Sequence, residues 1–272
     1  TDVACYGDIT GSIDLVLLNP AVSYTYAWST VSGIIPVGQA INEDLTDLSP
    51  GIYDVIITET TAGVTCVQDT FFEITEPLDP LSSTVNLWSH VDCFGDSTGI
   101  AFADVIGGTP GNYTYLWSNG ETTQIADSLW GDPSGQGVPF THTVTFTDAN
   151  GCTLVDSVDI INSHARIEGT LDTITHVSCF GACDGIAQLS SVGGLMPYDY
   201  QWDVGQVYSG SGPDTAYNLC FGGHSVIISD ALGCNTTIPF FIDEPDELLV
   251  DAFGNGVSFG TISTQTIQCY GF

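Results

Sequence analysis

The fold is decided by Tyr113-Thr114-Tyr115-Leu116-Trp117, a short segment in which every second residue is aromatic. Such alternation predicts a β-strand that carries its three aromatic side chains on one face. The segment recurs as Tyr24-Thr25-Tyr26-Ala27-Trp28 and as Tyr198-Asp199-Tyr200-Gln201-Trp202. Because one face of a sandwich strand has to be buried, we predict that these aromatic residues form the core. A ladder of this kind could otherwise stack on sugar rings.

Each aromatic segment lies between two cysteines that recur with it. The first cysteine opens a Cys-x-Gly turn, at Cys5, Cys93 and Cys179, and precedes the tryptophan at an almost constant spacing. The second cysteine follows the aromatic segment, at Cys66, Cys152 and Cys234. The period of the first cysteine is 88 (93 − 5) and then 86 (179 − 93). An internal repeat of this length indicates an array of small domains.

We predict an all-β protein of tandem immunoglobulin-like antiparallel β-sandwiches. Apolar residues alternate along the chain, and Gly, Pro, Thr and Asp recur too often for helices of any length. The expected units are residues 1–77 (a first repeat without its opening strand), 78–163, 164–245 and 246–272 (the start of a fourth repeat). We therefore interpret the chain as an internal part of a longer protein.

The two cysteines of each repeat predict one framing disulfide per repeat. The expected pairs are Cys5–Cys66, Cys93–Cys152 and Cys179–Cys234, with Cys183–Cys220 as a second bond in the third repeat and Cys269 left over. The sequence separation within the pairs is similar from one repeat to the next. No closely spaced cysteine and histidine pairs are present for zinc. Disulfides place the protein in an oxidising compartment, outside the cytosol.

The charge of the chain limits its partners. There is no Lys and one Arg, Arg166, against 33 acidic residues, for a formal net charge of −32. Such a surface repels phosphate, which excludes nucleic-acid binding, and no apolar stretch is long enough to insert into a membrane. Salt bridges cannot hold the domains together, so the repulsion between acidic residues has to be offset by divalent ions, by salt, or by disulfides and core packing. Trypsin has a single cleavage site, at Arg166.

Aromatic residues that occur in one repeat only are the candidates for contact with a ligand. They are Trp88, Trp130 and Tyr208. Trp130 opens a Gly- and Pro-rich insertion at 131–139 that only the second repeat contains, which favours it as part of a contact loop.

Acidic residues near the turns are candidates for calcium binding. They are Asp8, Asp96, Asp148, Asp184 and Asp230. Calcium takes six to eight oxygen ligands, but Asp also caps turns through its own backbone, and no EF-hand pattern is present. We expect no required cofactor, with calcium as a further option.

No catalytic constellation is found. Gly256-Val257-Ser258-Phe259-Gly260 matches the G-x-S-x-G pattern, but β-like residues follow where a hydrolase would have a helix. The histidines are isolated, and the chain is not expected to be an enzyme.

The recurring residues resemble the SprB repeat. The resemblance rests on Cys-x-Gly, Gly-Gly, Tyr-x-Tyr-x-Trp and Asp-Ala-x-Gly-Cys. The second copy carries it at Cys93, Gly95, Gly99, Gly107, Gly108, Tyr113, Tyr115, Trp117, Asp148, Ala149, Gly151 and Cys152. The third copy carries it at Cys179, Gly181, Gly185, Gly193, Gly194, Tyr198, Tyr200, Trp202, Asp230, Ala231, Gly233 and Cys234. The first copy departs from it with Asn19-Pro20 in place of Gly-Gly.

The resemblance implies a stretch of a very large extracellular adhesin on a bacterial cell surface. Proteins of this family occur in Bacteroidetes, where type IX secretion exports them and one acts in gliding motility. The implied partners are neighbouring repeats of the same chain and a surface polysaccharide or substratum. The phylum also glycosylates exported proteins at short Asp-Ser/Thr motifs. The resemblance therefore implies glycosylation at the residues that match such motifs, which are Ser97, Ser128, Ser157, Thr173 and Thr215.

Two other functions fit the residues. One is a carbohydrate-binding array attached to an extracellular enzyme. The other is the subunit of a fibre, in which an opening strand within residues 246–272 completes the first repeat of a neighbouring molecule by strand addition.

Overall fold

The computed structural model describes residues 1–18, 23–61, 63–135 and 137–247. These residues form eighteen β-strands and no helix, so the all-β prediction is confirmed. The expected fourth repeat at 246–272 lies, beyond Glu247, outside the described residues, as do Cys269 and the G-x-S-x-G segment.

The chain forms two compact units. The first contains Thr1–Ser89, Gly99–Leu129 and Thr141–Ile160, and the second contains His90–Thr98, Trp130–Phe140 and the chain from Ile161 onward. The expected second repeat, residues 78–163, thus contributes to both units.

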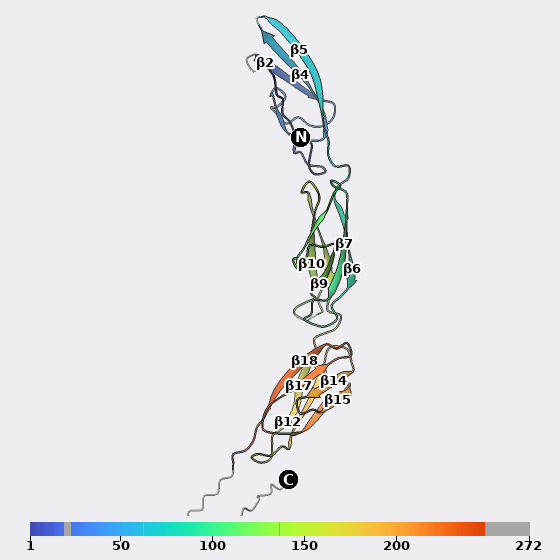
Figure 1. The fold of residues 1–272 in the computed structure, drawn as a ribbon, viewed down its shortest axis with the longest axis vertical. Coiled ribbons are helices and arrows are strands. Elements are labelled where there is room, and N and C mark those ends of the chain that lie inside the picture. Colours follow the sequence, from blue (N-terminus) through green and yellow to red (C-terminus); the bar gives the residue numbers. More distant parts are fainter. Residues whose placement is uncertain (19–22, 62, 136, 248–272) are drawn as a thin grey trace, which may run out of the picture. The chain divides into compact units, whose positions relative to one another are not determined.

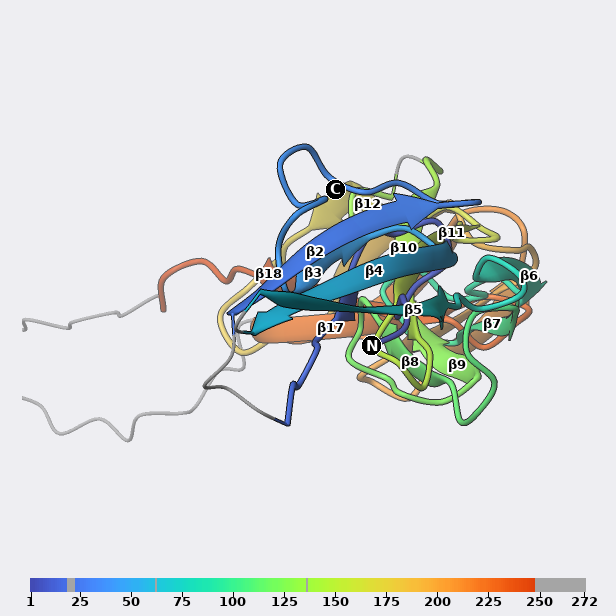
Figure 2. The same ribbon diagram turned by 90° about the horizontal axis from the view of Figure 1, so that it is seen from above.

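The N-terminal part of the first unit is a sandwich of two antiparallel sheets. One sheet pairs β1 (Gly11–Ile13) with β3 (Leu45–Leu48), and the other has the order β2 (Ser23–Thr30), β4 (Gly51–Thr61), β5 (Val64–Ile74). The three long strands lie side by side in both views (Figures 1 and 2). Leu45 and Leu48 from the small sheet pack with Trp28 and Tyr53 from the large one, which places the core between the sheets.

The same arrangement returns with one more strand in the remainder of this unit. One sheet has the order β6 (Ser82–Ser89), β7 (Gly99–Ile106), β9 (Ile125–Leu129), and the other β11 (Thr153–Ile160), β10 (Phe140–Thr147), β8 (Thr114–Trp117). In the β6–β7 ladder Ser89 pairs with Ile100. In the first sandwich, Thr1 exchanges two backbone hydrogen bonds with Ser12 of β1. Ser12 follows Gly11 as Ile100 follows Gly99, so Thr1 takes the position that Ser89 has in the second sandwich.

The second unit contains the third sandwich. Its sheets have the orders β12 (Glu168–Thr175), β13 (Gly185–Val192), β16 (Asp214–Leu219) and β15 (Val207–Gly210), β14 (Tyr198–Trp202), β17 (Gly222–Ser229), β18 (Asn235–Ile242). Leu189 and Leu219 of one sheet share a core with Tyr200, Val226 and Ile228 of the other. Immunoglobulin-like antiparallel sandwiches therefore make up the described chain.

The aromatic segments lie in β2, β8 and β14, and their tryptophans are buried. Trp28, Trp117 and Trp202 are 6%, 1% and 1% exposed. Each indole N–H donates a hydrogen bond, to the carbonyl oxygens of Asn42 and Thr123 and to the carboxylate of Asp214. Tyr198 and Tyr200 are buried, whereas Tyr24, Tyr26, Tyr113 and Tyr115 are half-buried.

The first tyrosine of the segment also holds the Gly-Gly turn. The Tyr113 hydroxyl donates to the carbonyl oxygen of Gly107 (2.7 Å), and the Tyr198 hydroxyl to that of Gly193 (2.5 Å). Gly107 has a φ of 78°, and a Cβ there would lie 2.0 Å from the carbonyl oxygen of Pro80. Glycine is therefore required at this point by both conformation and space.

Candidate functional site

The disulfides join one repeat to the next. Cys5 is bonded to Cys152 and Cys93 to Cys234, each with an S–S distance of 2.03 Å. The predicted pairs Cys5–Cys66, Cys93–Cys152 and Cys179–Cys234 are therefore wrong, and Cys66 is an exposed free thiol. Cys183–Cys220 forms as expected, and Cys179 is also disulfide-bonded.

The reason for the different pairing is the length of a strand. Cys93 lies just before β7 begins at Gly99, whereas the hairpin that carries Cys152 contacts the turn that follows the end of β7 at Ile106. The eight residues of β7 span about 26 Å. A disulfide needs Cα atoms within about 7 Å, so the two cysteines of one repeat lie at opposite ends of the sandwich and cannot bond.

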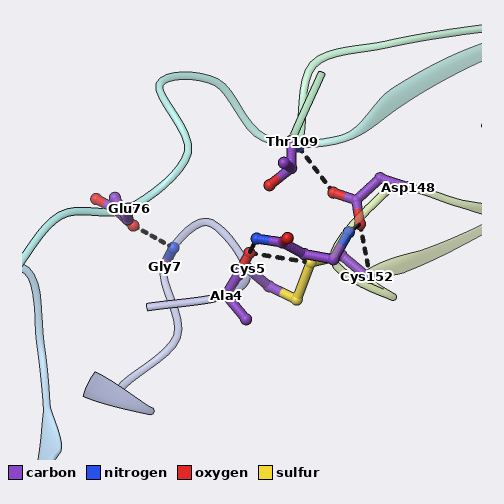
Figure 3. Close-up of a disulfide and its surroundings, with 8 residues drawn as sticks. Ala4, Cys5, Gly7, Glu76, Thr109, Asp148 and Cys152 are labelled. Atoms are coloured by element: carbon purple, nitrogen blue, oxygen red, sulfur yellow. Dashed lines mark hydrogen bonds between the residues drawn. A yellow bond between two sulfur atoms is a disulfide. The ribbon is translucent and has the colours of Figure 1, made fainter. Parts of the chain in front are cut away.

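The Cys-x-Gly motif is a tight turn that presents its cysteine. The amide of Asp8 donates to the carbonyl oxygen of Cys5 (3.1 Å), and the amides of Asp96 and Ala182 do the same to Cys93 and Cys179. The glycine at the third position has a φ of 80°, 90° or 73°. The first turn is also fixed by Glu76, whose Oε2 accepts the amide of Gly7 at 2.6 Å (Figure 3).

The partner cysteine is held by an aspartate. Asp148 Oδ1 accepts the amides of Asn150 and Cys152, both at 2.9 Å, and Oδ2 accepts the amide of Thr109 at 2.8 Å (Figure 3). Burial alone would raise the pKa of Asp148, but these backbone N–H groups outweigh it and hold the pKa below its ordinary value. The carboxylate thus fixes the Cys152 hairpin to the turn after β7.

The second junction repeats this geometry. Asp230 Oδ1 accepts the amides of Leu232 (2.9 Å) and Cys234 (3.0 Å), and Oδ2 accepts the amide of Leu195 (2.9 Å). A Cβ on Gly194 would lie 2.7 Å from Asp230 Oδ2, and one on Gly108 would lie 2.6 Å from Asp148 Oδ2. The Asp-Ala-x-Gly-Cys and Gly-Gly motifs therefore form one structure, in which the aspartate fills the space that the second glycine leaves.

Two of the five calcium candidates have this structural role. The carboxylate oxygens of Asp148 and Asp230 are occupied by backbone amides. Asp184 Oδ1 accepts the amide of Ser178 (2.9 Å), while Asp8 and Asp96 are exposed. Over the described ranges, no three His, Cys, Asp or Glu side chains gather closely enough to bind a metal ion. Calcium binding remains a prediction for the exposed carboxylates alone.

The candidate contact aromatics lie at the surface. Trp88 is 60% exposed and stacks on Phe102, with 5.6 Å between the ring centroids and 1° between the ring planes. Trp130 is 36% exposed beside Phe140, and Tyr208 is 43% exposed beside Tyr200. Trp88 belongs to the first compact unit, and Trp130 and Tyr208 belong to the second.

The candidate glycosylation residues are accessible. Ser97, Ser128, Ser157 and Thr173 are exposed, and Thr215 is half-buried. Whether they carry sugar remains a prediction.

The fold and its junctions define a class of protein: tandem β-sandwich repeats in which disulfides cross-link successive repeats. The SprB repeat family model matches residues 1–33, 89–122 and 171–207, and each match includes a Cys-x-Gly turn and an aromatic strand. These segments of the chain belong to the SprB repeat family. None of the curated proteins compared matches the chain.

Several solved structures are similar in fold only. The human desmocollin-1 ectodomain is 12% identical with a TM-score of 0.30, and the match covers 80% of this chain and 51% of that one. Sidekick-1 immunoglobulin domains 1–5 are 10% identical with a TM-score of 0.26, over 87% and 57% of the two chains. A tetra-tandem repeat from the extending region of a large adhesion protein is 14% identical with a TM-score of 0.21, over 84% and 68%. The chain thus spans about half the length of the first two.

Two further observations concern the environment of the protein. Its disulfides indicate an oxidising, extracellular location. Among the residues that the structure describes, no helix has the length and apolar character needed to cross a membrane.

Proposed function

We propose that the chain is a structural, non-enzymatic segment of a very large secreted adhesin, in which it transmits tension between a cell surface and whatever the adhesin holds. The observation that supports this most is the bond from Cys5 to Cys152, together with its counterpart from Cys93 to Cys234. A bond inside each repeat would leave the backbone as the single covalent connection between one repeat and the next. The observed bonds add a second covalent connection across each of these two junctions.

The finer parts of the proposal follow from the SprB family. They are a filament on the bacterial cell surface, export by type IX secretion in Bacteroidetes, and a role in attachment that extends to gliding motility. The partners are neighbouring repeats and a polysaccharide or substratum. Domain boundaries after Pro77, Ser163 and Pro245 belong to the same proposal. The first two are supported by the strand order, since β1–β5, β6–β11 and β12–β18 each form their own sheets.

The proposal is tested in the cell that makes the protein. An in-frame deletion of these residues is compared with a variant that carries Cys5→Ser and Cys93→Ser. We expect both cells to display the adhesin, to detach from a surface at lower shear than the parent cell, and, if they glide, to glide more slowly. Normal attachment and motility with both variants would contradict the proposal.

A second function, carbohydrate binding, is favoured by one observation. Trp88 and Phe102 form a pair of parallel rings on the outer side of the β6–β7 ladder, next to Asn86, which pairs with Phe102. Parallel aromatic faces with an amide alongside are suited to a neutral sugar ring. Glycan binding that Trp88→Ala abolishes, and that Trp130→Ala leaves intact, would favour this function over a purely mechanical one.

A further inference from the structure

Cys66 occupies the position in its hairpin that the bonded cysteines occupy in theirs. In the β4–β5 ladder Cys66 pairs with Glu59. In the later hairpins the amide of Asp148 donates to the carbonyl oxygen of Cys152 (3.0 Å), and the amide of Asp230 to that of Cys234 (2.9 Å). The three cysteines are therefore structurally equivalent, and not merely similar in sequence position.

The equivalent cysteines both hold the same kind of partner. Cys152 is bonded to the turn Cys5-Tyr6-Gly7, and Cys234 to the turn Cys93-Phe94-Gly95. In both cases the turn belongs to the preceding repeat, and the bonded cysteine is only 9% exposed. Cys66 alone of the three is exposed and free.

The turn contributes more than a sulfur atom to the junction. Its middle residue is aromatic, and Tyr6 lines a groove of about 440 Å³ beside Cys152 with Leu81 and Leu154. At the other junction the Phe94 ring lies 5.7 Å beneath the guanidinium of Arg166. Next to Cys66, Val64 lies on the same face of β5, since it is two residues away, and is 65% exposed. An apolar contact for an aromatic residue is thus available beside the free thiol.

We propose that Cys66 is the attachment site for a Cys-aromatic-Gly turn of a further repeat. The turn comes from a repeat other than the three described here, because Cys5, Cys93 and Cys179 are already in disulfides. The inference does not rest on the adhesive function.

The reaction is thiol–disulfide exchange. The thiol of Cys66 loses its proton to solvent, and the thiolate attacks the turn's sulfur, which is held in a mixed disulfide with a small thiol such as glutathione. The new S–S bond forms as the old one breaks, and glutathione leaves as the thiolate with the bonding electron pair. No net oxidation is needed at this step.

The test uses the full chain and two peptides in a glutathione buffer. One peptide has the sequence of residues 89–98, and the matched control carries Phe94→Ala. At exchange equilibrium, mass spectrometry measures how much Cys66 is bonded to peptide and how much to glutathione. We expect the ratio to be about tenfold higher for the first peptide, because burying one aromatic side chain is worth roughly an order of magnitude in an equilibrium constant.

A second measurement presents the turn on a folded scaffold. Cys152→Ser leaves Cys5 without its partner, so Cys5 of one molecule is free to bond Cys66 of another. We expect covalent multimers in which peptide mapping finds Cys5 linked to Cys66, and we expect none when Cys66→Ser is added. Either result, the tenfold preference or the mapped Cys5–Cys66 link, supports the proposal. Equal ratios for the two peptides together with no such link would overturn it.

Discussion

Cys5 is bonded to Cys152 across 147 residues, and Cys93, which lies inside that interval, is bonded to Cys234 across 141 residues. The two disulfides therefore overlap along the sequence. Cleavage of the backbone between two repeats therefore leaves the fragments joined by a disulfide, which bonds within single repeats would not do.

The first prediction concerns cleavage at Arg166, the single trypsin site. This residue lies between Cys93 and Cys234, so the fragments 1–166 and 167–272 stay joined by a disulfide. After denaturation with free thiols blocked, we expect one band at full mass on a non-reducing gel and two bands after reduction. In Cys93→Ser the fragments should separate without reductant. Separation of the unaltered protein without reductant would show that Cys93 and Cys234 are not bonded.

The second prediction concerns extension under force. The shortest covalent path from Cys5 to Cys234 runs through both disulfides and the backbone between Cys93 and Cys152, instead of through the whole backbone between Cys5 and Cys234. At full extension the shorter path measures about 200 Å and the longer path about 800 Å. Single-molecule pulling should give the shorter length for the oxidised protein and the longer one after reduction. Equal lengths in the two states would contradict the pairing.

The third prediction concerns Asp148, whose carboxylate accepts three amides. Asp148→Asn replaces one acceptor oxygen with an N–H₂ group and removes the charge. At least one backbone N–H group then faces the donor N–H₂ group and loses its acceptor. We expect the free energy of unfolding in urea to fall by about 1–3 kcal/mol. Asp96→Asn, at an exposed position, should change it by no more than about 0.5 kcal/mol. Similar losses in the two variants would argue against a special role for Asp148.

The fourth prediction concerns pH. The pKa of Asp148 is lower in the folded protein than its ordinary value of 3.8. Its contribution to stability is therefore fully present above that ordinary value and is lost as the pH falls through the lower, folded pKa. Acidification also relieves repulsion among the many other carboxylates, so the useful quantity is the difference in stability between the parent and Asp148→Asn. This difference should be constant at neutral pH and should shrink below about pH 4. A difference that is unchanged at pH 2 would contradict the assignment.

The fold was predictable because the alternation of aromatic residues in these segments predicts both a β-strand and the face of that strand that is buried. Trp28, Trp117 and Trp202 are the three tryptophans of the motif, and all are buried. The prediction of framing disulfides within single repeats is wrong, because a constant period makes a partner in the same repeat and a partner in the next repeat equally regular. A signal was nevertheless present: the strand that follows Cys93 is too long for Cys93 to reach the hairpin at its far end.

The role of the acidic turn was only partly visible in the sequence. The sequence predicts that Asp148 and Asp230 lie in turns, and calcium binding is the further role that it suggests for them. Their oxygens instead accept amides from the Gly-Gly turn, some 35 to 39 residues away in sequence. These hydrogen bonds form only when the Asp-Ala-x-Gly-Cys hairpin packs against the Gly-Gly turn. Neither motif predicts them by itself.

The overlap of the disulfides also determines the order in which they form during synthesis. A protein that emerges N-terminus first exposes Cys5 long before Cys152, so the bond between them has to wait for the hairpin of the following repeat. The most recently completed repeat therefore always carries an unpaired cysteine in its turn, and oxidation advances along the chain one repeat behind folding. A premature bond to another cysteine is therefore the error that this order of bond formation allows.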